Sequence, residues 1–138
     1  MAEPFAWPVR VYWEDTDAGG VVFYANYLKF FERARTECFR QHGLGQEALR
    51  QEHGVQLVVA EVSCKYLQSA RLDDQLSVSV ALLECRGASL VLAQRIERDG
   101  ALLVAATTRI AALRASSFRP CPLPEFLSST LKPLLETP

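Results

Sequence analysis

The chain has 138 residues, of which 49% are hydrophobic and 22% are charged. This length is typical of one domain that can bury a core, and the composition excludes disorder for most of the chain. Lysine and arginine number 15 and aspartate and glutamate 16, so the formal net charge is −1. Such a balance gives no strong positive field that would favour nucleic acid. We therefore expect residues 1–138 to form a single domain that does not bind nucleic acid.

Neither a signal peptide nor a transmembrane segment is expected. The N-terminal residues MAEPFAWPVR lack a basic region followed by an apolar run, and no stretch approaches the roughly 18 apolar residues that a membrane span needs. The four cysteines are widely spaced, without a C-x-x-C motif, and only two histidines are present. These features predict buried thiols in a reducing cytoplasm and give little support to a metal site. We expect a cytoplasmic protein without a metal or redox cofactor.

The N-terminal third of the chain predicts a strand, a loop and a long helix. Apolar and polar residues alternate over Val9–Glu14, which indicates a strand. Asp15–Gly20 follows, and its Asp and Gly residues favour a loop. From about Phe23 to His42 apolar residues recur every three or four positions and share one helical face, opposite a polar strip that includes Arg35. The apolar face is so wide that we expect this helix to be largely enclosed.

The remaining sequence predicts a short helix, four strands and a second short helix. The first short helix is expected over Leu44–Gln51. Alternating patterns predict strands over Val55–Leu67, Gln75–Cys85, Ser89–Arg98 and Ala101–Arg114. Asp99-Gly100 separates the last two strands and is a strong signal for a two-residue hairpin turn. After a Pro-rich segment, Glu125–Leu135 predicts the closing helix.

This order of elements predicts the fold class. Short connections between strands favour antiparallel pairing. We expect an α+β fold in which an antiparallel sheet of about five strands wraps around one long central helix. The core is expected within about residues 8–114, with a Pro-rich tail and a short helix over residues 115–138. Because such a sheet leaves an edge and an outer face uncovered, we expect a homodimer or a homotetramer.

The candidate chemistry lies where the first loop meets the long helix. Glu14, Asp15 and Asp17 crowd this junction, and Gly20 would let a substrate approach the backbone closely. The first turn of a helix has backbone N–H groups without intrahelical partners and a partial positive charge, which suit the oxyanion of an acyl-transfer intermediate. A nearby carboxylate could attack a carbonyl or activate a water. By themselves, the same residues also fit a helix cap.

A longer motif resembles a known family. The run from Tyr12 to Arg35, YWEDTDAGGVVFYANYLKFFERAR, is similar to the signature of the hotdog-fold acyl-CoA thioesterases. It resembles the 4-hydroxybenzoyl-CoA thioesterase family, and within it the Tol-Pal-associated bacterial branch most of all. The D-x-D, the glycine, the aromatic-x-N-Y and the E-x-A-R stand at the family's spacing. Lys65–Val78 resembles the family's second strand and turn, and the likeness covers about Pro8–Arg114.

The resemblance implies an enzyme that hydrolyses an acyl-CoA thioester to the free acid and CoA. It places the catalytic carboxylate on Asp17, as a nucleophile or a general base, and the backbone N–H that polarises the thioester carbonyl on Tyr24. Asp15 and Glu14 are then expected to organise the loop. Around them we expect substrate contacts from Trp13, Gly20, Val22, Phe23 and, at a phosphate of CoA, Arg86.

Two positions depart from the branch. Tyr24 stands where many of its members have His, and Trp13 stands where many have Tyr. We therefore assign the mechanism to Asp17 and to the main-chain N–H, and the side chains of Tyr24 and Trp13 to the walls of the pocket.

Other functions stay open at this point. One alternative is a non-catalytic module that binds acyl-CoA or acyl carrier protein, in contact with phospholipid-synthesis enzymes or the Tol-Pal system at the inner membrane. Another is a hotdog hydratase, which needs an Asp–His pair. His42, expected to cap the long helix, and His53, expected in an exposed turn, do not fit that pair. The length and the type of the acyl chain are not predicted.

Overall fold

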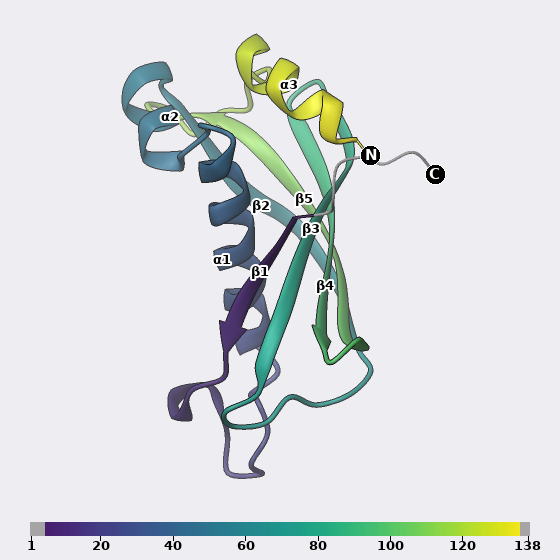
Figure 1. Ribbon diagram of the computed structural model, residues 1–138. Helices are drawn as coiled ribbons and strands as arrows, with labels where there is room; N and C mark the ends of the chain where they lie inside the picture. The colour runs from purple at the N-terminus through teal and green to yellow at the C-terminus, as the bar shows by residue number, and fades with distance from the viewer. Residues whose placement is uncertain (1–4, 136–138) are drawn as a thin grey trace.

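A computed structural model describes residues 5–135. Its helices are α1 (Asn26–Gln41), α2 (Gln46–His53) and α3 (Glu125–Leu131), with short 3₁₀ turns at Trp13–Asp15 and Lys132–Leu134. Its strands are β1 (Phe5–Arg10), β2 (Val55–Tyr66), β3 (Gln75–Arg86), β4 (Ser89–Arg98) and β5 (Ala101–Arg114) (Figure 1). Within residues 5–135, no helix is long and apolar enough to cross a membrane.

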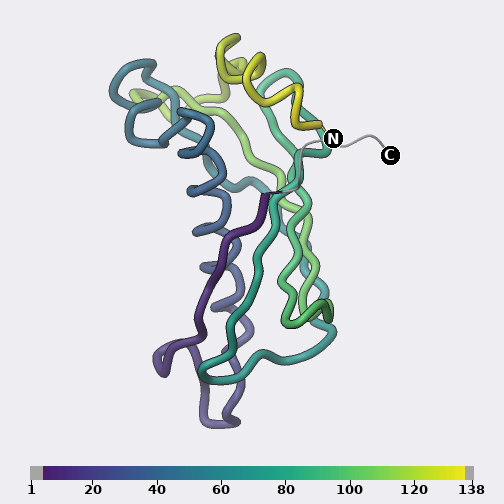
Figure 2. The backbone as a smooth tube through the Cα atoms, viewed as in Figure 1, coloured from purple at the N-terminus to yellow at the C-terminus, as the bar shows by residue number. Residues whose placement is uncertain are grey.

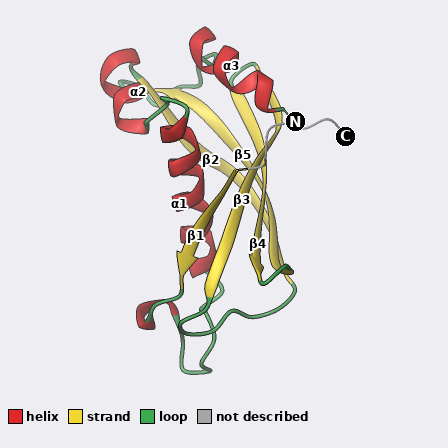
Figure 3. Ribbon diagram, in the orientation of Figure 1, coloured by secondary structure: helices red, strands yellow, loops and turns green. Residues whose placement is uncertain are grey.

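The five strands form one antiparallel sheet in the order β1-β3-β4-β5-β2. Strands β3, β4 and β5 follow one another through tight turns, while β1 and β2 form the two edges (Figure 3). Asp99 and Gly100 join β4 to β5 with φ angles of 50° and 83°. These left-handed conformations suit the two-residue hairpin turn that the Asp-Gly pair predicts, and the predicted α+β class and antiparallel sheet are confirmed.

Helix α1 lies along one face of the sheet and contacts β1 and β3 (Figures 1 and 2). Its apolar face is buried as the spacing predicts, through Tyr27, Phe30, Phe31, Ala34, Cys38 and Phe39. The predicted helix is therefore confirmed, although it begins at Asn26, a turn later than Phe23. The delay arises because the Asn26 N–H donates to the Phe23 carbonyl in a tighter turn.

One residue of the predicted polar strip is buried. Arg35 faces the sheet, where its Nη1 donates to Oε1 of Gln94 on β4 at 3.0 Å. Gln94 in turn donates from Nε2 to the Phe31 carbonyl, also at 3.0 Å. The removal of water around the guanidinium lowers the pKa of Arg35 from its usual range. Arg35 belongs to the predicted polar strip and is nevertheless buried, because a polar side chain of β4 supplies the partner that burial requires.

The first strand differs from its prediction. Strand β1 ends at Arg10, so only the beginning of the predicted strand Val9–Glu14 is confirmed. The ladder ends there because its partner β3 begins at Gln75. The Tyr12 N–H then donates to the Asp15 carboxylate at 2.8 Å, which draws the chain into a 3₁₀ turn.

The C-terminal segment packs against the sheet. Leu127 and Leu131 of α3 are buried in the same core as α1, and the helix predicted over Glu125–Leu135 is confirmed as α3 followed by a 3₁₀ turn. All four cysteines are free thiols, and three of them are buried. Burial raises the pKa of Cys38 to about 11, so this thiol stays protonated at neutral pH.

The packing of α1 generates a stability prediction. Phe30→Ala removes a ring that is 0% exposed, and we expect the free energy of unfolding to fall by about 3–5 kcal/mol, measured by urea denaturation. Phe118→Ala, at a position that is 63% exposed, is the matched control and should change stability by less than about 0.5 kcal/mol. Equal losses in the two variants would contradict the placement of α1.

Candidate active site

The loop that carries Asp17 is a short hairpin. Thr16 and Val22 form an antiparallel bridge, and the Asp17 N–H donates to the Val21 carbonyl at 2.9 Å. The turn is closed by Gly20, whose N–H donates to the Asp17 carbonyl at 3.0 Å and whose φ is 81°. A residue with a side chain is strained at that φ, which explains the glycine.

The Asp17 carboxylate is exposed and only half engaged. Its Oδ1 accepts the Gly19 N–H at 2.8 Å. A Cβ at position 19 would lie 3.2 Å from the same oxygen and would crowd it. The glycine avoids this close contact, so the carboxylate can keep its position. Within residues 5–135, Oδ2 has no hydrogen-bond partner. One oxygen is therefore held by the loop, and the other is available for chemistry.

A buried carboxylate, Asp15, organises the beginning of α1. Its Oδ2 accepts the Tyr12 N–H at 2.8 Å, and its Oδ1 accepts Nδ2 of Asn26 at 3.0 Å. The Asp15 carbonyl also accepts the Phe23 N–H at 2.9 Å. The prediction that Asp15 organises the loop is confirmed, and the Asn of the aromatic-x-N-Y motif is explained as its partner.

The backbone N–H of Tyr24 is left without a partner. The neighbouring Phe23 N–H is taken by Asp15, and the Asn26 N–H is taken by Phe23. No acceptor within the described part of the chain receives the Tyr24 N–H. The N–H of Ala25 likewise has no acceptor among the described residues, so two unpaired amides stand just before α1, where the peptide dipoles of the helix favour negative charge.

Aromatic side chains form a wall beside this amide. The ring of Tyr24 lies 5.0 Å from that of Phe23 and 6.1 Å from that of Tyr66, between centroids. Trp13 is also exposed, on the 3₁₀ turn. Tyr66, at the end of β2, was missed by sequence reasoning, because no local pattern links it to the loop. Val22, in contrast, is buried, so its side chain belongs to the core and does not line this exposed region.

Arg86 is not brought to Asp17 within one chain. It is the last residue of β3, its side chain is 83% exposed, and it forms an ion pair with Glu84. Asp17 belongs to the loop that is bridged to Arg71, just before the first residue of β3. Since a strand rises about 3.3 Å per residue, the 12 residues of β3 separate the two positions by most of the length of the sheet.

The histidines lie at the other end of α1. His42 follows the last residue of the helix, with Nδ1 2.8 Å from the Cys38 carbonyl, and His53 packs its ring against Phe126 at 4.2 Å. An Asp–His pair with Asp17 is therefore not formed within this chain. In residues 5–135, no group of three His, Cys, Asp or Glu residues could hold a metal ion.

Comparison with known proteins agrees with this architecture. The sequence matches the thioesterase-like superfamily over residues 11–131, and the chain belongs to that superfamily. Its five-stranded antiparallel sheet and α+β class are those of the superfamily's hotdog fold.

Three similar proteins have names that refer to thioesterase activity. The acyl-CoA thioester hydrolase YbgC of Escherichia coli O157:H7 is 43% identical over 129 residues, which cover 93% of this chain and 96% of that protein. The acyl-CoA thioesterase YbgC of Haemophilus influenzae is 42% identical over 121 residues, 88% of this chain and 89% of the relative. The crystal structure of a probable thioesterase from Bartonella henselae superposes with a TM-score of 0.83 at 31% identity, covering 88% of this chain and all of that one.

A buried hydrogen bond beside the site gives a second prediction. The Tyr27 hydroxyl accepts the N–H of Ala70 at 3.0 Å, and burial raises the pKa of Tyr27, so the hydroxyl stays protonated. Tyr27→Phe leaves that buried N–H without an acceptor and should lower the free energy of unfolding by about 1–3 kcal/mol in urea denaturation. Tyr12→Phe alters an exposed ring and is the control. Equal stability of Tyr27→Phe and wild type would contradict the bond.

Proposed function

We propose that the protein hydrolyses acyl-CoA thioesters, with Asp17 as the reacting carboxylate and the Tyr24 N–H as the donor to the carbonyl oxygen. The observation that carries the proposal is that two groups of one loop–helix junction have no hydrogen-bond partner. Oδ2 of Asp17 and the N–H of Tyr24 both lack partners among the described residues. The relatives named YbgC are an acyl-CoA thioester hydrolase and an acyl-CoA thioesterase, which supports this reaction.

The chemistry follows from these two groups. The thioester oxygen accepts the Tyr24 N–H, and this bond strengthens as negative charge develops in the tetrahedral intermediate. Oδ2 of Asp17 attacks the carbonyl carbon, the CoA sulfur leaves as a thiolate, and water then hydrolyses the mixed anhydride. In the other route, Asp17 takes a proton from a water that attacks the carbonyl directly. Both routes give the free acid and CoA.

The surroundings fit an acyl-CoA. We place the acyl group against the rings of Phe23, Tyr24 and Trp13, with Gly20 leaving room beside the carboxylate. Arg86 lies at the other end of β3 in the same chain, so a contact between Arg86 and a CoA phosphate requires Arg86 of a second protomer. The assigned site is therefore shared between copies of the chain.

The exposed edge of the sheet supports such an assembly. The whole middle of β2, Val59–Ser63, is exposed, and Val59 and Val62 are 49% and 40% accessible. The opposite edge, β1, has half the length and carries Pro8, which blocks further pairing. A long edge with exposed valines needs a cover. We infer that a second copy covers β2 in a homodimer, on which a homotetramer can be built, and that α1 becomes the central helix around which the sheet curls.

The cellular setting remains a prediction of the resemblance to the Tol-Pal-associated branch. It comprises a cytoplasmic location, peripheral association with the inner membrane, and contact with acyl carrier protein or phospholipid-synthesis enzymes.

The catalytic assignment is tested with a panel of acyl-CoAs of different chain lengths, by release of the free CoA thiol. We expect Asp17→Asn to lower turnover by about 100-fold or more while the fold is kept. Asp99→Asn, in an exposed turn that accepts Asn-Gly equally well, is the control and should match wild type. Near-full activity of Asp17→Asn would contradict the role of Asp17. Tight acyl-CoA binding by the wild type without any thiol release would favour the binding module instead.

The assembly is tested by Val62→Lys, which places a charge on the exposed edge strand. Because burying an unpaired ammonium is costly, we expect the molar mass in sedimentation velocity to fall from that of the oligomer to that of the monomer. Phe118→Lys changes an exposed residue that follows β5, outside the exposed middle of β2, and should leave the mass unchanged. An unchanged mass in Val62→Lys would rule out an interface through β2.

A further inference from the structure

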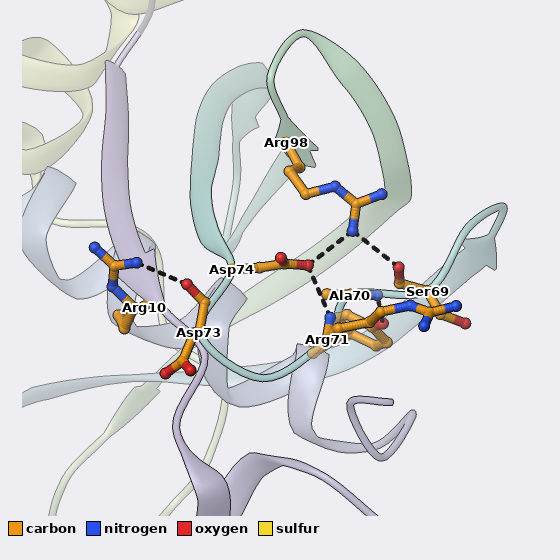
Figure 4. A network of polar contacts seen from close by, with 8 residues as sticks. Arg10, Ser69, Ala70, Arg71, Asp73, Asp74 and Arg98 are labelled. Atoms are coloured by element: carbon orange, nitrogen blue, oxygen red, sulfur yellow. Dashed lines mark hydrogen bonds and ion pairs between the residues drawn. The ribbon is translucent and has the colours of Figure 1, made fainter. Parts of the chain in front are cut away.

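Arg98, the last residue of β4, binds the loop of residues 69–74, which has no role in the proposed mechanism. Nη1 of Arg98 donates to Oδ2 of Asp74 at 2.7 Å and to the Ser69 carbonyl at 3.2 Å (Figure 4). The same oxygen of Asp74 accepts the Arg71 N–H at 2.8 Å. A single guanidinium on the sheet thus holds both ends of the segment 69–74 together.

The middle of this segment is joined to α1 and to the Asp17 loop. Ala70 is fully buried; its N–H donates to the Tyr27 hydroxyl at 3.0 Å, and its carbonyl accepts the Val22 N–H at 2.9 Å. Val21 and Arg71 form a further antiparallel bridge. The segment 69–74 therefore packs against residues 21–22, the second arm of the Asp17 hairpin.

The connection continues to Asp17. Its N–H donates to the carbonyl of Val21, and Thr16 pairs with Val22. Three short pieces of backbone, residues 16–17, 21–22 and 70–71, thus lie side by side. Asp17 is on the outermost piece, and Arg98 holds the innermost piece to the end of the main sheet.

The Arg98–Asp74 pair is suited to a fixed position. Its side chains are 28% and 23% exposed, so water screens the pair less than it screens a surface ion pair. Partial burial acts to raise the pKa of Asp74, but the Arg71 N–H and the Arg98 guanidinium outweigh it and lower that pKa. Asp74 thus stays ionised, and its hydrogen bonds are charge-assisted.

We propose that Arg98 is a positioning residue for the hydrolysis. Through Asp74 and Ala70 it fixes the hairpin that carries Asp17, without touching the substrate. This inference rests on the proposed function. A short exposed hairpin is ordered mainly by its contacts with the segment beneath it, here residues 69–74. A displacement of about 1 Å at a reacting group can cost about 100-fold in rate. Loss of the Arg98 contacts therefore lowers turnover more than it changes substrate binding.

The first measurement compares Arg98→Gln with Arg95→Gln. Arg95 lies on the same strand and pairs with Glu97 at 3.4 Å, so it offers the same substitution away from the loop. We expect Arg98→Gln to lower kcat by about 10- to 100-fold with KM changed less than about 3-fold. Arg95→Gln should stay near wild type in both. Arg98→Lys keeps the charge and should recover part of kcat. Wild-type kcat in Arg98→Gln would overturn the inference.

A double-mutant cycle separates this inference from the proposed function. If Arg98 acts through Asp17, then Arg98→Gln causes no further loss in an Asp17→Asn background. The same fold-loss in both backgrounds would show that Arg98 acts by another route and would overturn the inference alone. Full activity of Asp17→Asn would instead overturn the proposed role of Asp17. Asp74→Asn, which keeps an acceptor oxygen but loses the charge, repeats the cycle if Arg98→Gln does not fold.

Discussion

A buried carboxylate determines how this chain enters its longest helix. Asp15 binds the backbone before it through the Tyr12 N–H, the helix through Asn26, and the returning loop through the Phe23 N–H. These three bonds turn the chain out of the sheet and fix the direction in which α1 begins. Asp15 takes the Phe23 N–H and the Phe23 carbonyl takes the Asn26 N–H, so among the described residues the N–H groups of Tyr24 and Ala25 are left for a ligand. A structural requirement of the helix start thus creates the reactive junction.

The strands could be predicted closely where each position alternates between core and solvent. Strands β4 and β5 have the predicted bounds, and β3 extends one residue further. The end of β1 could not be predicted, because it depends on where β3 begins and on the carboxylate of Asp15. The burial of Arg35 could not be predicted either. Helical periodicity places it beside exposed residues, and only the sheet shows that Gln94 lies beneath it.

The candidate site was predicted unevenly for a related reason. Asp17 and Tyr24 belong to one continuous motif, and they were selected by the resemblance of that motif to a known family, because residue type and spacing alone also fit a helix cap. Arg98 and Tyr66 join the same region from distant parts of the sequence, and their neighbours carry no pattern that points to the loop. Arg86 illustrates the opposite case. A residue can match a family position in sequence and yet lie far from the site within its own chain. Only the assembly of two copies would then bring Arg86 of one copy to the site of the other.

The division of labour at Tyr24 has a consequence for how such an enzyme diversifies. The proposed chemistry draws on the main chain of this residue, which every substitution except proline retains. Its side chain is 63% exposed and contributes little to the core. Substitution of this ring can therefore change which acyl groups bind, while the hydrogen bond from the backbone and the stability of the fold are kept. A residue whose backbone N–H holds the carbonyl oxygen while its side chain contacts the acyl group is a natural point of divergence among paralogues.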